Sequence, residues 1–169
     1  ERRLREALSS QHGIVNVRFD PVVLAEIPPM LRKNDWAIRL FVRDGLGSPS
    51  IVGAAPVGTH PLGLAVDIGT TKVAAYLIDL ETGETLGASG EMNPQIAFGE
   101  DVMARIAYAM KGEGHLRELQ RAIVQGVEDR TRQLCEACDR GCQEILEAVL
   151  VGNTCMHHLI LGLPVDQLG

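Results

Sequence analysis

The sequence has 169 residues, of which 46% are hydrophobic and 22% are charged, a composition typical of a folded globular protein rather than a disordered one. Because 16 basic residues stand against 22 acidic ones, the formal net charge is −6, which argues against a nucleic-acid backbone or an anionic membrane as the main partner. Apolar runs stay shorter than the roughly 18 residues of a membrane-spanning helix.

The start of the chain, its cysteines and its turn-rich stretches indicate its processing, its compartment and its division into domains. It starts without methionine, so we expect a fragment or a processed chain. Four cysteines without an export signal favour a reducing cytoplasm over a disulfide framework. Gly, Pro and Ser concentrate over 44–50 and 53–61, which indicates turns or a linker. The sequence therefore predicts a small α+β domain over 1–60 and a second domain over 61–169.

The first domain is predicted to combine short strands with a helix. Asp20-Pro21 is typical of a helix start, with Asp as the cap and Pro in the first turn. Pro28-Pro29 should interrupt or kink this helix, because proline lacks an amide donor and clashes with the preceding turn. Met30-Leu31 and Trp36 are expected in the core. Alternating apolar and polar residues predict strands over 14–19 and 36–42, with a shorter one over 50–54.

The second domain is predicted to be an α/β layer that starts with an antiparallel meander. Its longest helix has apolar residues such as Leu119, Ile123 and Leu134 at helical spacing. The predicted elements are strands over 62–67, 72–80 and 84–90, helices over 101–110 and 115–137, a strand over 145–151 and a helix over 155–161.

The strongest motif, Asp-Ile-Gly-Thr-Thr-Lys, links the first two strands of the second domain. Gly69 lets the backbone approach an anion, and the amides that follow can point at phosphate oxygens. Thr70 and Thr71 add hydroxyl donors, and Lys72 would add a positive charge. Asp67 is suited to hold a hydrated Mg²⁺. The spacing is not that of a helix-opening phosphate loop, and the alternative interpretation is an ordinary hairpin turn.

A second polar motif, Gly-Asn-Thr, follows the strand over 145–151. It places Asn153 and Thr154 at the carboxyl end of a strand, where α/β folds bind ligands. Both side chains are also suited to cap the next helix, and capping is the favoured interpretation for Thr154.

Three cysteines form a Cys-x-x-Cys-x-x-x-Cys run. Cys135, Cys138 and Cys142 fit an iron–sulfur or zinc interpretation in part, with Cys155 as the remaining fourth ligand. Because a second Cys-x-x-Cys pair is missing, the favoured interpretation is free thiols at a helix end that act as small hydrophobic residues.

Together, these motifs resemble the actin-like ATPase domain of the reductive activators of corrinoid proteins. Asp-Ile-Gly-Thr-Thr alone is shared with sugar and acetate kinases, chaperone ATPases and actins, so the order of three segments carries the resemblance. Residues 14–61 resemble the middle domain of the same family through Ile-Pro-Pro-Met-Leu-Arg at 27–32. The three segments are 63–80, 93–95 with 99–106, and 151–163.

The resemblance implies an α/β fold: a partial ribonuclease H-like or actin-like ATPase subdomain, truncated at Gly169, after a small α+β domain. It also implies ATP and Mg²⁺ as cofactors, with Asp67 as the catalytic and metal-binding residue. The residues implied to bind the cofactor are Gly69, Thr70, Thr71, Lys72 and Asn153.

The implied function is the ATP-dependent return of an oxidised Co(II) corrinoid to Co(I). The implied partners are a corrinoid protein and an electron-donor protein, and a homodimer is compatible with them. An iron–sulfur cluster is expected only in other parts of the parent protein, because the plant-type cysteine run is missing here. With half of the cleft missing, the 169 residues alone should bind ATP weakly or not at all. Two alternatives stay open: a small-molecule kinase of the same superfamily, and a non-catalytic dimerisation or partner-docking module.

Overall fold

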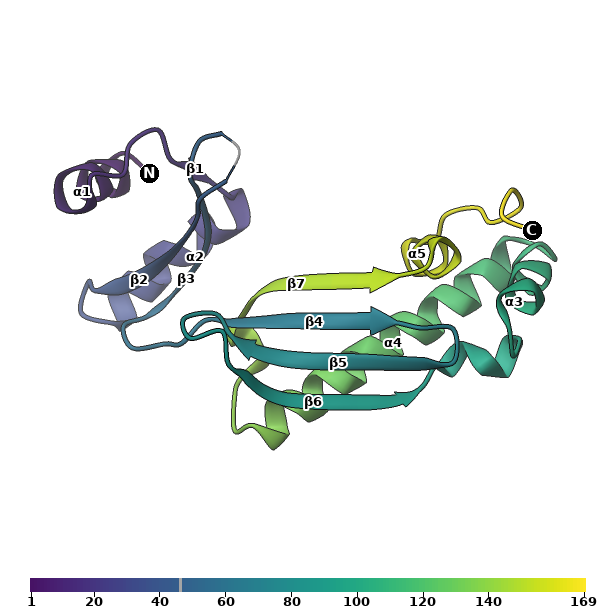
Figure 1. The fold of residues 1–169 in the computed structure, drawn as a ribbon. Coiled ribbons are helices and arrows are strands. Elements are labelled where there is room, and N and C mark those ends of the chain that lie inside the picture. Colours follow the sequence, from purple (N-terminus) through teal and green to yellow (C-terminus); the bar gives the residue numbers. More distant parts are fainter. Residues whose placement is uncertain (46) are drawn as a thin grey trace. The chain divides into compact units, whose positions relative to one another are not determined.

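The chain folds into two compact units, Glu1–Thr59 and His60–Gly169, which are described separately below (Figure 1). The computed structural model describes residues 1–45 and 47–169. Leu46, in the turn predicted over 44–50, lies outside the described residues. Both units contain a sheet with helices, which confirms the predicted mixed α/β class.

The first unit is a three-stranded sheet with two helices, ordered β1-β3-β2. Strand β1 runs parallel to β3, whereas β2 runs antiparallel to it. Buried apolar side chains from both helices and the sheet form one cluster, which includes Leu8, Ile27 and Ile51. The elements are α1 (Arg2–His12), β1 (Arg18–Phe19), α2 (Pro21–Lys33), β2 (Ile38–Arg43) and β3 (Ser50–Pro56).

Helix α2 confirms one prediction about its sequence and excludes the interruption that another prediction allowed. Its start is as predicted, because the Asp20 carboxylate accepts a hydrogen bond from the Val22 amide at 2.8 Å. Pro28-Pro29 do not interrupt the helix, which continues to Lys33. The apolar face of α2, with Ile27 fully buried just before the prolines, holds the helix against the sheet, so packing overrides the two lost donors.

Two other expectations for the first unit need correction, and one helix was not predicted. Trp36 is 72% exposed and lies outside the core, because it sits at a positive φ in the turn after α2. The strand predicted over 14–19 is only Arg18–Phe19, because the residues before it leave the sheet. Helix α1 was not predicted, although Gly13 ends it in the left-handed conformation that favours glycine.

The second unit is a four-stranded sheet in the order β6-β5-β4-β7. Strands β4 (Leu62–Ile68), β5 (Lys72–Asp79) and β6 (Thr85–Met92) form the predicted antiparallel meander, and β7 (Ile145–Gly152) adds parallel to β4. The helical segments are η1 (Pro94–Phe98), α3 (Val102–Ala109), α4 (Glu113–Ala137), η2 (Cys142–Glu144) and α5 (Thr154–Leu161), of which η1 and η2 are 3₁₀ helices.

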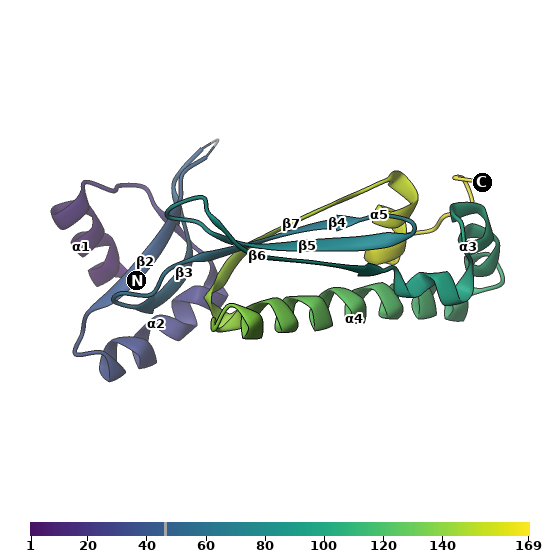
Figure 2. The same cartoon turned by 60° about the horizontal axis from the view of Figure 1, so that its bottom comes forward.

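The long helix α4 runs along one face of this sheet and provides much of its core (Figure 2). Its apolar stripe is buried as predicted, with Leu119 and Ile123 fully enclosed and Leu134 nearly so. Strand side chains alternate between this core and the opposite face, where Asp67 and Val151 are exposed neighbours in register. Among the described residues, no helix is long and apolar enough to cross a membrane.

Candidate functional site

The turn between β4 and β5 carries the candidate phosphate motif. Asp67 is the second-last residue of β4 and is exposed, and Lys72, also exposed, begins β5. Between them, Gly69 comes so close to the start of β5 that an added Cβ would lie 2.6 Å from the Lys72 carbonyl oxygen. Glycine is therefore required here by the packing of the turn against its own strand, in addition to the predicted approach of an anion.

The carbonyl groups of this turn accept hydrogen bonds from buried residues of the same unit. The Asn93 side-chain amide donates to the Gly69 oxygen at 2.8 Å, and the Asn93 backbone amide donates to the Thr71 oxygen at 2.8 Å. The Arg105 guanidinium donates to the Thr70 oxygen at 2.6 Å. Three successive carbonyls, 69–71, are thus directed toward the interior.

Inward carbonyls direct the next amides outward, because carbonyl and amide point in opposite directions across a planar trans peptide. All peptide bonds in the described residues are trans. The Thr70 and Thr71 amides therefore face away from Asn93 and Arg105, and neither donates a hydrogen bond within the part of the chain that the structure describes. Two unpaired, adjacent amides of this kind form an anion-binding concavity.

The two residues that hold the turn are buried and locally fixed. Asn93 is the N-terminal cap of η1, and its side-chain oxygen accepts from the Gln95 amide at 2.9 Å. Arg105 belongs to α3, whose start is capped by Asp101, and its side chain is fully buried. Burial lowers the pKa of the Arg105 guanidinium from its usual value, although arginine stays charged in proteins.

Asn153 also contacts this turn, through the Thr70 hydroxyl. Its side-chain oxygen accepts from the Met156 amide at 3.0 Å and so caps α5, while its side-chain nitrogen donates to the Thr70 hydroxyl at 3.2 Å. The cap is therefore Asn153, one of the two residues predicted as suited to capping, whereas Thr154, for which capping was the favoured interpretation, is the first helical residue. The positive end of the α5 dipole is adjacent to the turn as a result.

The structure thus gathers the predicted site residues at one end of the second sheet, where the β4–β5 turn, α3 and the start of α5 meet (Figure 1). Sequence reasoning missed Asn93 and Arg105. The available signal was the position of Arg105 on the apolar stripe of its helix, three residues after Val102 and directly before the buried Ile106.

A hollow beside the same sheet is lined by β5, β6 and α4, with Val73, Met92 and Arg130 among its residues. Residues 67–72 do not line it. The turn instead borders solvent through the exposed Thr71 and Lys72.

The cysteines lie in two separate places. Cys135 is buried in the core near Cys138 and Cys142, and burial raises the pKa of the Cys135 thiol to about 12. Cys155 is buried in α5, beyond the eight residues of β7, so it lies at the other end of the sheet from Cys135. The geometry therefore does not bring together the four cysteines that the less favoured metal interpretation would need.

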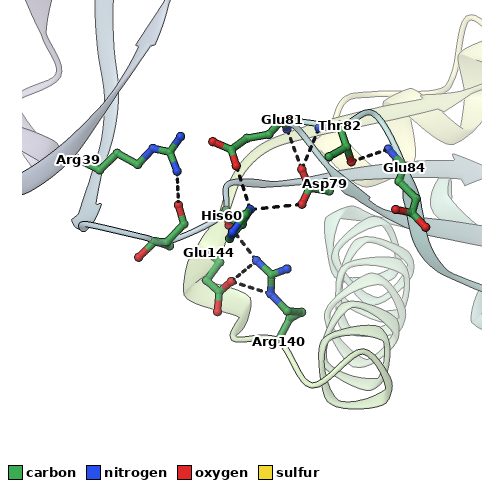
Figure 3. A network of polar contacts seen from close by, with 9 residues as sticks. Arg39, His60, Asp79, Glu81, Thr82, Glu84, Arg140 and Glu144 are labelled. Carbon is green, nitrogen blue, oxygen red and sulfur yellow. Dashed lines mark hydrogen bonds and ion pairs between the residues drawn. The ribbon is translucent and has the colours of Figure 1, made fainter.

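At the opposite end of β4, a polar network surrounds His60 (Figure 3). The His60 Nδ1 lies 2.9 Å from a Glu81 oxygen and 3.7 Å from an Asp79 oxygen. Arg140 donates to the His60 carbonyl at 2.9 Å and to the Glu144 carboxylate at 2.8 Å. This network joins the start of β4, the β5–β6 turn and η2.

Asp79 provides a pH-dependent prediction for this network. Backbone amides of Thr82 and Glu81 donate to its carboxylate, which lowers its pKa from the usual value. Because the folded state lowers this pKa, the stabilisation is present above the unfolded value of about 3.9 and is lost as the pH falls through the folded value. We expect Asp79→Asn to lower Tm at pH 7 and to differ less from wild type as the pH falls below about 4.

Thermal unfolding followed by circular dichroism across this pH range measures the effect, with the exposed Asp166→Asn as control. A difference between Asp79→Asn and wild type that stays constant with pH would contradict the assigned role of the carboxylate.

Comparison with known proteins identifies the family of the chain. Residues 62–169 match the family model described as the RACo middle region, and residues 2–60 match that of the RACo linker region. The family thus uses the term middle for the second unit, whereas the sequence interpretation applied it to the first.

Two relatives agree with this match. The corrinoid activation enzyme RamQ of Eubacterium limosum is 39% identical over 107 residues, which cover 63% of this chain and 18% of that protein. A solved structure described as a reductive activator for corrinoid, iron-sulfur protein is similar with a TM-score of 0.80 at 33% identity, over 97% of this chain and 26% of that one. The chain thus spans no more than 26% of the length of either relative. The resemblance to reductive activators of corrinoid proteins is confirmed, and the chain belongs to the RACo family.

Proposed function

We propose that the turn 69–71, together with Asp67, holds the phosphates and the Mg²⁺ of ATP in a protein that returns corrinoid Co(II) to Co(I). The observation that carries this proposal is the inward direction of three successive carbonyls, which leaves the Thr70 and Thr71 amides available to an anion. The adjacent start of α5 adds the positive end of a helix dipole.

Asp67 fits the proposed metal. Its carboxylate is exposed beside the turn and takes part in no hydrogen bond or ion pair among the described residues. Mg²⁺ keeps several of its waters and is bound through one or two carboxylates together with substrate phosphates, so a single unpaired carboxylate at this position is sufficient. Lys72, at the start of β5, supplies a cation on the same turn.

The chemistry we propose for the whole protein follows its relatives. One electron passes from a donor protein to Co(II), which becomes Co(I), and ATP supplies the free energy for this uphill step. For ATP to act in this way, it must bind one conformation of the protein better than another, and the turn is the part of this chain that would sense the phosphates. The partners are a corrinoid protein and an electron-donor protein, and the iron–sulfur cluster belongs to other parts of the parent.

Family membership favours this function over a small-molecule kinase. The actin-like form of the subdomain, the homodimer and the cytoplasmic location stay predictions. The docking-module alternative is one outcome of the experiment below.

Asp67→Asn in the full-length protein that contains this sequence tests the proposal. We expect Mg²⁺-dependent ATP binding to weaken at least about tenfold, because the substitution removes a metal-binding charge with little change in shape. Calorimetry measures the affinity, and the visible absorbance of the corrinoid measures ATP-dependent formation of Co(I).

Glu84→Gln, in the turn at the opposite end of the sheet, is the matched control and should retain both activities. ATP binding and Co(I) formation that are unchanged in Asp67→Asn would remove the proposed mechanism. A wild-type protein that binds its corrinoid partner but no ATP would support the docking module instead.

A further inference from the structure

The second unit buries the positive charge of Arg105 without an ion-paired carboxylate among the described residues. Arg105 is fully buried, and its guanidinium donates to the carbonyls of Gly99 and Thr70 at 2.9 and 2.6 Å. Its remaining contacts are the Gln95 side-chain oxygen and the Met156 sulfur, each at 3.4 Å. Among the described residues, no carboxylate lies within 4.0 Å of this guanidinium. A buried cation of this kind is costly unless another charge compensates for it.

The hydrogen bond from Arg105 to Thr70 does not by itself require a charged donor. The neutral side-chain amide of Asn93 donates to the neighbouring Gly69 carbonyl. Asp101, the carboxylate that lies close in sequence, attracts the guanidinium electrostatically from beyond ion-pair distance, and its oxygen is engaged at the start of α3, where it accepts from the Ala104 amide at 2.7 Å. The full positive charge of Arg105 is therefore unexplained by the contacts within the unit.

The charge lies directly behind the proposed anion site. Arg105 contacts the carbonyl end of the Thr70–Thr71 peptide, and the Thr71 amide at the other end of the same peptide faces outward. A cation on the carbonyl polarises the peptide so that its amide becomes a stronger donor. Its field also reaches the outer surface of the turn through a low-dielectric interior, where charge interactions are screened less than in water.

We infer that Arg105 is the buried counter-charge of the phosphate site and that it selects ligands with several phosphate charges. It acts through the Thr70–Thr71 peptide and touches no ligand itself, so it is a positioning residue rather than a catalytic one. This inference rests on the proposed function of the turn. It deepens that function by assigning to Arg105 the preference of the site for ATP over nucleotides and nucleosides of lower charge.

Arg105→Gln and Arg105→Lys in the full-length protein separate charge from hydrogen bonding. Calorimetry gives the affinities for Mg·ATP, Mg·ADP and adenosine. We expect Arg105→Gln to lower the affinity for Mg·ATP at least about tenfold and the affinity for Mg·ADP by a smaller factor. The affinity for adenosine should not change measurably, because the lost interaction scales with the charge of the ligand. Arg105→Lys, which keeps the charge, should recover most of the loss.

A second variant tests the same charge without altering the contact to the turn. Gln95→Glu places a carboxylate next to the guanidinium and leaves Arg105 able to donate to Thr70, although it also removes the hydrogen bond from the Gln95 side chain to the Leu119 carbonyl. We expect this variant to lower the affinity for Mg·ATP more than the affinity for adenosine. It also tests the role of the charge if Arg105→Gln does not fold. The exposed Arg121→Gln on α4 is the control and should bind all three ligands as the wild type does.

The outcomes distinguish this inference from the proposed function. Equal losses for Mg·ATP and adenosine, or no recovery with lysine, would show that Arg105 only clamps the turn and would overturn the inference. Wild-type affinity for Mg·ATP in Arg105→Gln and Gln95→Glu would also overturn it and leave the proposed function intact. A wild-type protein that binds no Mg·ATP would remove both.

Discussion

Gly69→Ala is expected to weaken Mg·ATP binding by about a hundredfold or more in the full-length protein, because the new Cβ would lie 2.6 Å from the Lys72 carbonyl oxygen. That oxygen belongs to the backbone of β5, so it cannot move aside as a flexible side chain would. The turn must shift instead, and the hydrogen bonds from Asn93 and Arg105 to its carbonyls would be lost. Calorimetric titration with Mg·ATP measures the effect.

Gly90→Ala is the matched control for this substitution. Gly90 lies in β6 of the same sheet, and an added Cβ there meets nothing within 4 Å. It should leave nucleotide affinity and Tm close to those of the wild type. Equal affinities in Gly69→Ala and Gly90→Ala would show that the geometry of the turn does not determine nucleotide binding.

Ile123→Ala is expected to destabilise the second unit by about 2–4 kcal/mol, through lost burial and the cavity that remains. Ile123 is fully buried in the face of α4 that packs on the sheet. Hydrogen-exchange mass spectrometry on peptides from α4 and β5 should show exchange at least about tenfold faster, because exchange from the core follows the free energy of opening.

Val124→Ala on the same helix is the control, since Val124 is 37% exposed and its truncation removes less buried area than that of the fully buried Ile123. It should leave the exchange of β5 close to wild type. If Ile123→Ala and Val124→Ala accelerate exchange equally, α4 does not carry the core of this unit as described.

The order of the elements in the second unit could be predicted from the sequence because its signals are local. The meander follows from apolar runs separated by turn residues, and α4 follows from the spacing of Leu119, Ile123 and Leu134. The same local signals placed Asp67, the turn and Asn153 near strand ends. Their meeting at one end of the sheet depends on the parallel pairing of β7 with β4.

What could not be predicted depends on tertiary contacts. The role of Arg105 arises from a contact across 35 residues, and that of Asn93 from one across 24, which no local pattern contains. Pro28-Pro29 lie within a helix that packing maintains, and Trp36 is exposed because a positive φ at that residue turns the chain. In these places the rest of the fold overrides local preference.

The double attachment of Thr70 has a mechanical consequence. Its carbonyl is held by Arg105 of α3, and its hydroxyl is held by Asn153 at the start of α5. Both helices also pack against α4, which runs the length of the sheet (Figure 2). A displacement of this single threonine would therefore shift α3 and the start of α5 together, and both helices would transmit it to α4.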